Sequence, residues 1–506
     1  MQISANRFNH GSSANGMRIV LLLLLFLLSL YEFKSMGLKG MGMVCAIPVA
    51  VIYITIAFRW KMFTFWTLFF LNYFLMFLDR YGYIPMPTSL PNELFEIMLL
   101  CIAIIDGKLF MNARLCNLLQ FSMLLWVAFC TLQVLNNTCN LGMNVSAWYT
   151  GARLMAFQLL YATIVCAIYV TQPETMVKFF KFWAFCSIFA VFWVWKQRTF
   201  GFTQPEKAFL VHAGRTHIIH GIIRYFSCFT DAANFGIHMA SASVLFFIIA
   251  ITNRIKRTRL FFLAVALGTT WAMFTSGTRT AIFCMIAGFM VFVFLSRSVK
   301  IAIPVSVIFG ALVFVLAFTK IGEGNSMIRR MRTAFDRNDA SAGVRDINKE
   351  AISKYMKEAP WGIGLGMDVS KIPPHNKYHT LSMIPPDSEY VYIWVHAGPI
   401  GVVVFVITTI LLFGGACYIT LFRLKSQSLR GYGAGLCSAF VALHLGGYAN
   451  QILMQFPNIF LFYGGMSILY NMPYFEQKYL EYEEKILAGN EEKKRLKEEK
   501  KRGSEV

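Results

Sequence analysis

The chain has 506 residues, of which 57% are hydrophobic, 16% aromatic and only 14% charged. Soluble domains carry roughly a quarter of charged residues, so this composition excludes an ordinary soluble protein and indicates a chain that lies mostly among membrane lipids. The formal net charge of +21 would suit nucleic-acid binding, but the apolar runs leave no soluble basic domain for it, and we expect no nucleic-acid partner.

About fourteen mainly apolar runs follow one another along the chain. Each comes near the length of about 20 residues that a helix needs to cross a membrane. They lie near 18–33, 41–58, 62–78, 93–106, 115–135, 153–171, 178–195, 233–252, 260–275, 280–296, 301–319, 390–414, 431–447 and 452–470. We therefore predict an all-α, polytopic membrane protein with about 12–14 transmembrane helices.

Lysine and arginine are unevenly divided between the two sides of this predicted bundle. If the N-terminus is cytoplasmic, the inner connections hold most of these residues, and the short outer connections hold few. Short loops rich in lysine and arginine stay in the cytoplasm, which places both termini there. The predicted parts are transmembrane helices at 1–195, a large outer loop at 196–232, transmembrane helices at 233–319, a helical outer cap at 320–389, transmembrane helices at 390–470 and a charged cytoplasmic tail at 471–506.

The first large outer loop, 196–232, is basic, which opposes the charge rule for outer loops. Its cations are Lys196, Arg198, Lys207, Arg215 and Arg224, against only Glu206 and Asp231. This excess suggests that the loop meets an anion. Three histidines in the loop could ligate a metal, but no carboxylate or cysteine completes a set at ligand spacing, so we expect no metal site.

The second large outer loop, 320–389, has the pattern of a folded cap. Apolar residues recur at helical spacing over 325–335, with arginines on the other faces, and a second helical pattern begins near Ser341 and ends before Pro360. Glycines at 362, 364 and 366 predict a flexible turn. The proline-rich run that follows holds His375, Asp387 and Glu389, which could move a proton.

Three motifs, in this order, resemble signatures of the O-antigen ligase and polymerase superfamily of bacterial integral-membrane glycosyltransferases. They are RYFSCFTDAANFG at 224–236, SGTRTA at 276–281, and PWGIGLG at 360–366 paired with DSEYVYIWVHAGPIG at 387–401. The resemblance covers roughly residues 200–415. It implies a multi-pass protein of the bacterial inner membrane, with the active site facing the periplasm and no cofactor.

The chemistry that this resemblance implies needs cations and a base. Breaking a sugar–diphosphate bond requires positive charge on the leaving diphosphate, and arginine offers a fork that fits phosphate oxygens. Arg224 and Arg279 are the first candidates, with Arg345 and Arg215 as further ones, and they would work without a metal. An alternative, non-catalytic role for Arg279 is that of a helix-end residue whose side chain reaches the lipid headgroups.

The base is left open between two residues, because the chain departs from the family pattern. The family usually has a His-Asn pair eleven residues before the first glycine of the last motif, but counting back from Gly398 reaches Asp387. The pair His375–Asn376 lies farther upstream. Histidine titrates near neutral pH, as suits a base, whereas position favours Asp387. Both residues therefore remain candidates for the base, and Glu389 is the third candidate.

The leading hypothesis is a glycan transferase of cell-surface polysaccharide synthesis. Its donor would be a glycan on a polyprenyl (undecaprenyl) diphosphate carrier. Its acceptor would be the lipid A core of lipopolysaccharide for a ligase, another glycan for a polymerase, or a protein. The alternative is a secondary transporter or flippase for lipid-linked glycans, which would place ionisable residues deep in the spans. Only Glu96 and histidines 238, 396 and 444 lie deep in the apolar runs, which favours the enzyme.

Overall fold

The computed structural model describes residues 6–82, 89–109, 112–219, 221–297, 299–322, 324, 326–332 and 340–503. Within these residues, seven helices are long and apolar enough to cross a membrane. They are Lys61–Arg80, Leu118–Leu135, Val145–Tyr169, Pro173–Thr199, Ala232–Thr252, Lys256–Thr275 and Glu389–Arg423. The predicted all-α, polytopic membrane fold is confirmed.

The other predicted runs are helices as well, although they fall short of those criteria of length and composition. Three shorter apolar helices cover Ile47–Arg59, Thr280–Leu295 and Ile303–Val315. Three of the remaining runs lie in the helices α1, α4 and α18, whose bounds follow below. The run at 452–470 begins as a non-helical stretch and becomes helical only from residue 459, in η5 and then α19. Seven spans are therefore shown among the described residues, and the larger number of 12–14 stays a prediction.

The chain divides into two compact units, Met1–Trp66 and Thr67–Val506. The first unit consists mainly of α1 (Asn6–Met36) and α2 (Leu38–Arg59), which contact each other. Gly37 joins them with a φ of 64°, a left-handed angle that glycine adopts without strain. The first two predicted runs lie in these two helices.

The second unit holds the remaining elements. In chain order they are α3 (Lys61–Arg80), which begins in the first unit, α4 (Ser89–Ile105), α5 (Leu118–Leu132), η1 (Gln133–Leu135), α6 (Val145–Ala152), η2 (Arg153–Phe157), α7 (Gln158–Tyr169), α8 (Pro173–Thr199), α9 (Gln204–His217), β1 (Ile218–Ile219), β2 (Ile222–Ile223), α10 (Ala232–Thr252), α11 (Lys256–Thr275), α12 (Thr280–Leu295), α13 (Val299–Phe318), α14 (Ser326–Arg332), α15 (Ala340–Met356), α16 (His379–Met383), α17 (Glu389–Tyr418), η4 (Ile419–Arg423), α18 (Gln427–Ala449), η5 (Ile459–Tyr463) and α19 (Gly464–Gly503). β1 and β2 pair as a short antiparallel hairpin.

Helix α10 is the centre of the second unit. It is apolar on every side and packs against α11, α12 and α18, and 89% of its most apolar window is buried within the protein. A helix that is hydrophobic all round is expected to lie inside a bundle rather than at its edge. Its N-terminal end, which follows Asp231, is therefore held firmly in place.

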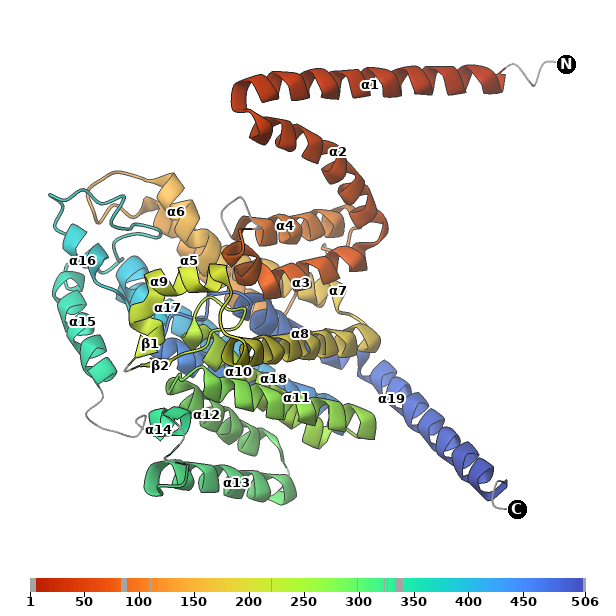
Figure 1. The fold of residues 1–506 in the computed structure, drawn as a ribbon, viewed down its shortest axis with the longest axis vertical. Helices are drawn as coiled ribbons and strands as arrows, with labels where there is room; N and C mark the ends of the chain where they lie inside the picture. Colours follow the sequence, from red (N-terminus) through yellow and green to blue (C-terminus); the bar gives the residue numbers. More distant parts are fainter. Residues whose placement is uncertain are drawn as a thin grey trace. The chain divides into compact units, whose positions relative to one another are not determined.

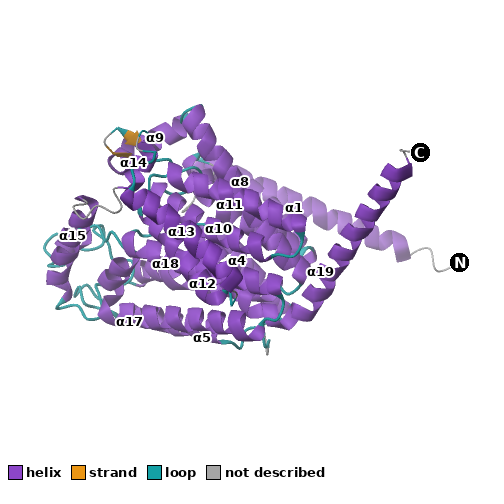
Figure 2. Cartoon of the chain, turned by 90° about the horizontal axis from the view of Figure 1, so that it is seen from below, coloured by secondary structure: helices purple, strands orange, loops and turns teal. Residues whose placement is uncertain are grey.

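The two large predicted outer loops lie at the same end of the second unit. Figures 1 and 2 both show α9, α14 and α15 at one end of the helices, whereas the last part of α19 leaves from the other end. The side of the membrane that residues 196–232, 320–389 and the tail face stays a prediction.

The predicted cap has a hydrophobic core of its own. Ile352 and Met356 of α15 pack with Ile363 and Tyr378, and the loop before α6 adds Cys139. The helix expected at 325–335 is present as α14, and the chain outside it in this range lies outside the described residues. The second expected helix is α15, which ends at Met356, before Pro360.

The glycine-rich turn after α15 is packed against the start of α17. Gly362, Gly364 and Gly366 have φ angles of 76°, 103° and 69°. The backbone N–H of Ile363 donates to the carbonyl of Val395 at 2.9 Å, and that of Gly364 donates to His396 at 3.1 Å. The turn expected to be flexible is thus hydrogen-bonded to a membrane helix.

Helix α17 is kinked at Gly398, where this turn meets it. Gly398 has a φ of 72° and a non-helical ψ, and Pro399 follows it. A Cβ atom at Gly398 would lie 2.1 Å from the carbonyl oxygen of Pro360, and one at Gly362 would lie 2.4 Å from the backbone carbon of His396. The two segments approach this closely because neither carries a side chain there.

We expect Gly398→Ala to prevent stable folding of the cap on α17. Alanine in the left-handed backbone conformation costs about 1–2 kcal/mol. The added Cβ also clashes with a backbone carbonyl of the facing segment, and no change of rotamer can relieve this clash. Gly414→Ala, in the same helix with nothing within 4 Å of its Cβ position, is the control and should be neutral or stabilising. The measurement is the yield of monodisperse protein in detergent and its melting temperature; equal yields would contradict this role.

Candidate active site

Arg224 lies against the turn that joins α11 to α12. Its Nη1 donates to the carbonyl of Thr216 at 2.8 Å, and its Nη2 donates to Oγ1 of Thr278 at 3.0 Å. Its Nε reaches the carbonyl of Ser276 at 3.4 Å. The second motif of the sequence, 276–281, forms this turn, so the structure brings the first two motifs together.

Two further arginines lie at the same turn. Arg279 precedes the first residue of α12, and Nε of Arg330, from α14, donates to the carbonyl of Gly277 at 2.8 Å. We call Arg224, Arg279 and Arg330 the arginine cluster. Burial and the positive charges of Arg330 and Arg279 lower the pKa of Arg224 to about 10, while Asp231 opposes the shift. Such crowding of cations costs free energy that a bound anion would offset.

Of the other candidate residues in the first loop, only some have side chains that the structure describes. Arg215 belongs to α9, but its side chain lies outside the described residues, as do the side chain of His212 and the whole of His220. His217 is buried, and its Nε2 accepts from the backbone N–H of Ala232 at 3.2 Å. Across the described part of the chain, no three metal-ligating side chains gather in one place. The expectation of no metal stays a prediction.

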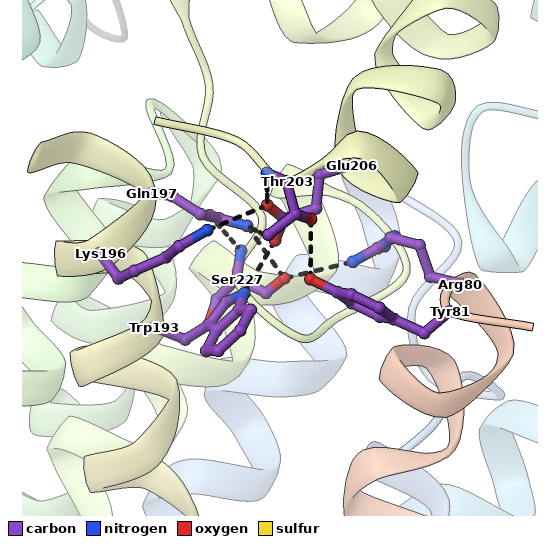
Figure 3. A network of polar contacts seen from close by, with 8 residues as sticks. All are labelled: Arg80, Tyr81, Trp193, Lys196, Gln197, Thr203, Glu206 and Ser227. Carbon is purple, nitrogen blue, oxygen red and sulfur yellow. Dashed lines mark hydrogen bonds and ion pairs between the residues drawn. The ribbon is translucent and has the colours of Figure 1, made fainter. Parts of the chain in front are cut away.

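Glu206 anchors the loop that carries Arg224. Its Oε1 accepts from Nε1 of Trp193 at 2.8 Å and from Nε2 of Gln197 at 2.7 Å, and its Oε2 accepts from the backbone of Thr203 at 2.7 Å (Figure 3). Nζ of Lys196 lies 3.7 Å from Oε2. Burial alone would raise the pKa of Glu206, but these hydrogen bonds outweigh it and hold the pKa below its ordinary value.

The same network reaches the next part of the loop. Gln197 Oε1 accepts from the backbone of Ser227 at 3.0 Å, and Nη1 of Arg80 donates to the carbonyl of Ser227 at 3.2 Å. The hydroxyl of Tyr81 lies 2.8 Å from that of Thr203 (Figure 3). Arg80, at the end of α3, and Gln197 of α8 thereby fix the loop on both sides of Arg224.

We expect Glu206→Gln to destabilise the protein at neutral pH by about 1–3 kcal/mol. Both carboxylate oxygens of Glu206 accept hydrogen bonds, whereas the NH₂ group of a glutamine amide cannot accept one. The folded-state pKa is depressed, so the carboxylate stabilises the fold above the unfolded-state pKa of about 4.3, and this contribution is lost as the pH falls. The difference in melting temperature from wild type should shrink from pH 7 to pH 4. Glu350→Gln, at an exposed ion pair, is the control; a constant difference would contradict the prediction.

Asp387 and Arg345 line one cavity of about 620 Å³, which we call the larger cavity. Nδ2 of Asn348 donates to Oδ2 of Asp387 at 2.8 Å. The remaining wall is mostly apolar and includes Trp394, Val402 and Val403 of α17, and Tyr448. Val403 and Tyr448 are 57% and 66% exposed, on surfaces that meet lipid in a membrane protein. The larger cavity thus joins an apolar wall to a charged rim.

Glu389 lies on the other side of the same segment. It is buried and lines a second cavity of about 430 Å³, which we call the smaller cavity. Its Oε2 accepts from the backbone N–H of Leu453 at 2.9 Å. The carboxylate therefore also holds the turn that leads from α18 to η5.

His375 is exposed and lines neither cavity. Its neighbour Asn376 donates to the carbonyl of Cys139 at 2.7 Å, which fixes this loop against the core of the cap. The structure thus brings Asp387 to Arg345, places Glu389 in a different cavity, and keeps His375 apart from both. Arg224 and Arg279 line neither cavity.

The end of α18 connects the arginine cluster with the two cavities. Oγ of Ser388 donates to the carbonyl of Gly447 at 3.2 Å, and a Cβ atom at Gly446 would lie 2.4 Å from Ile237 of α10. Helix α10 begins after Asp231, whose charge acts on Arg224. The cluster and the carboxylates therefore belong to the same end of the bundle.

Two residues of this region were not expected from the sequence. Arg330 was interpreted as part of the polar face of an amphipathic helix, and Asn348 was not considered. The sequence carries a weak signal for Arg330, since three arginines in a short outer helix repeat the excess of cations seen in the first loop. For Asn348 it carries no signal.

Residues 263–406 match the family model described as O-antigen ligase, and no curated protein matches the chain. The matched range contains Arg279, Arg330, Arg345, His375 and Asp387, whereas Arg224 precedes it. Together with the apolar helices, this match indicates a multi-pass membrane protein whose residues 263–406 are similar to the O-antigen ligase family, and the resemblance to the O-antigen ligase and polymerase superfamily is confirmed over those residues.

Proposed function

We propose that this protein transfers an oligosaccharide or polysaccharide from a polyprenyl-diphosphate carrier to an acceptor hydroxyl at the periplasmic face of the bacterial inner membrane. The observation that carries the proposal is the arginine cluster, in which two of three members belong to the ligase domain. Three guanidinium groups around one turn suit a diphosphate, which offers several oxygens to bidentate donors.

The proposed reaction needs no bound metal. The acceptor oxygen attacks the anomeric carbon of the donor sugar, the bond from that carbon to the diphosphate oxygen breaks, and the carrier diphosphate leaves with the bonding electrons. The arginine cluster stabilises the negative charge that develops on the leaving group. A carboxylate or histidine takes the proton of the acceptor hydroxyl.

Asp387 is the residue that the geometry favours as this base. It lines the larger cavity beside Arg345, and Asn348 orients its carboxylate. Glu389 is tied to the turn at Leu453, and His375 lies on the exposed loop. The apolar wall of the larger cavity would hold isoprene units of the carrier, and Arg345 and Lys349 lie near its charged end. The arginine cluster lines neither cavity, so the donor would extend from the larger cavity to the cluster at the same end of the bundle.

The identity of the acceptor is tested by deleting the gene and analysing lipopolysaccharide and capsule on gels. Loss of polymer from the lipid A core, with carrier-linked polymer accumulating, would support a ligase. Attachment of single repeat units only would support a polymerase. Purified protein in liposomes with a carrier-linked donor should form a new glycosidic bond. Movement of the donor across the bilayer without bond formation would instead support the transporter.

A further inference from the structure

The segment 384–389 is a wall between the two cavities, and its residues divide between them. Ile384, Pro386 and Glu389 line the smaller cavity, whereas Pro385, Asp387 and Ser388 line the larger one. The first turns of α17 continue this division. Tyr392 and His396, at helical spacing from Glu389, face the smaller cavity, and Val391 and Trp394 face the larger one.

The lining of the smaller cavity is of a different chemical kind. It is still mainly apolar, but it carries more polar groups than the larger cavity, both donors and acceptors: Asp368, Glu389, Ser382, Lys371, Gln451 and Gln455. Thr150 and Asp368 are exposed at its rim, while Glu389 and His396 are buried at its base. The cavity thus opens to the side of the cap and ends at a membrane helix.

One buried polar atom of this cavity lacks a partner. Oε1 of Gln455 is buried and accepts no hydrogen bond from any group of the described chain. The backbone of Gln455 is bonded in the local turn, so the free side-chain acceptor plays no part in the turn itself. A buried acceptor of this kind costs free energy unless a ligand or water supplies a donor.

We propose that the smaller cavity binds the terminal sugar of the acceptor glycan, which rests on the proposed function. Sugar hydroxyls both donate and accept hydrogen bonds, as this mixed lining requires, and about 430 Å³ lies within the usual range for small-molecule sites. The larger cavity, with its apolar wall, suits the lipid-linked donor. The wall at 384–389 then keeps the two substrates apart except at its ends.

The division also gives the two carboxylates different partners. Asp387 lines the larger cavity, and Glu389 lines the smaller one, where it helps to hold the turn at Leu453 beside the bound sugar. The reacting hydroxyl of the acceptor would extend past the end of the wall to reach both Asp387 and the anomeric carbon of the donor. Glu389 is therefore a positioning residue for the acceptor. The arrangement gives separate roles to Asp387 and Glu389, although they are only two residues apart in the sequence.

Two variants of the full-length protein test the proposal. Gln455→Leu keeps the side-chain volume and removes the free acceptor, and Thr150→Trp narrows the rim of the cavity. Ser146→Trp, one turn earlier on α6 and exposed, is the control, because it lines neither cavity. All three should keep the melting temperature of the wild type.

The probes are the lipid-free core oligosaccharide and one lipid-free repeat unit from the organism that encodes the chain, each titrated calorimetrically into protein in nanodiscs. We expect wild type and Ser146→Trp to bind one of them, and both cavity variants to bind it at least tenfold more weakly. In transfer assays the variants should raise KM for the acceptor at least tenfold and leave KM for the donor unchanged.

Unchanged binding by both cavity variants, binding of neither probe to the wild type, or a change in donor KM alone would overturn the proposal. The calorimetric measurement does not depend on catalysis. A wild type that binds a probe but forms no glycosidic bond would therefore refute the proposed function while leaving the sugar site supported.

Discussion

Arg279→Ala should lower the rate of glycan transfer by about 100- to 1,000-fold, because one of three cations facing the leaving diphosphate is removed. The protein should still insert and accumulate, since α11 and α12 pack against α10. Arg279→Lys keeps the charge and loses the bidentate fork, so it should recover the rate only in part. The rate is measured with purified protein and a carrier-linked donor.

Arg224→Ala should lower the rate to a similar extent but also reduce stability. Its guanidinium bonds Thr216, Ser276 and Thr278, so its loss frees two loops as well as removing a charge. The melting temperature of Arg224→Ala measures the loss of stability, and the transfer rate per folded protein measures the loss of the charge. Arg198→Ala, an exposed arginine at the end of α8, is the control. Normal transfer by both cluster variants would exclude the diphosphate role.

The helices were predictable because their signal is local. A run of about 20 apolar residues has to be a helix in a membrane, since every backbone polar group needs a partner within its own segment. The run at 390–414 is α17, and those at 233–252 and 260–275 are α10 and α11. The length of each span was harder to predict from the sequence than its presence. A helix that is buried inside the bundle, such as α12, can be short.

The tail at 471–506 shows where composition misleads. The sequence predicted no more than a charged cytoplasmic tail, and the structure shows a helix there, as the continuation of α19. Two of its glutamates, however, contact the bundle. Glu476 accepts from the backbone of Ser426 at 2.8 Å, and Glu483 is buried against Arg254 at 3.7 Å. A docked glutamate and a solvated one look alike in a charge-rich sequence.

The site was predictable in its parts but not in its grouping. The motifs led to Arg224, Arg279 and Asp387 because these residues stand in short patterns that are visible along the chain. The contact between Arg330 and Gly277 spans 53 residues and depends on how α14 packs beside α11 and α13. The separation of Asp387 from Glu389 depends on which face of one turn meets each cavity, and no pattern in the sequence reports that.

Asp387→Asn should lower turnover by about 100- to 10,000-fold, because an amide cannot take the proton of the acceptor hydroxyl. Asparagine still accepts from Asn348, so the larger cavity should keep its shape and the protein its melting temperature. His375→Ala should stay near the wild-type rate, since the histidine is exposed and lines neither cavity.

Asp346→Asn is the matched control, because Asp346 lines the same cavity and is exposed. Turnover numbers at saturating donor and acceptor decide between the two candidate bases, and melting temperatures show whether each variant is folded. A large loss in His375→Ala with normal turnover in Asp387→Asn would move the base to the histidine, and the exposed loop would then have to close over the larger cavity during transfer. Near-normal turnover in both, and in Glu389→Gln, would place the base outside the 375–389 run.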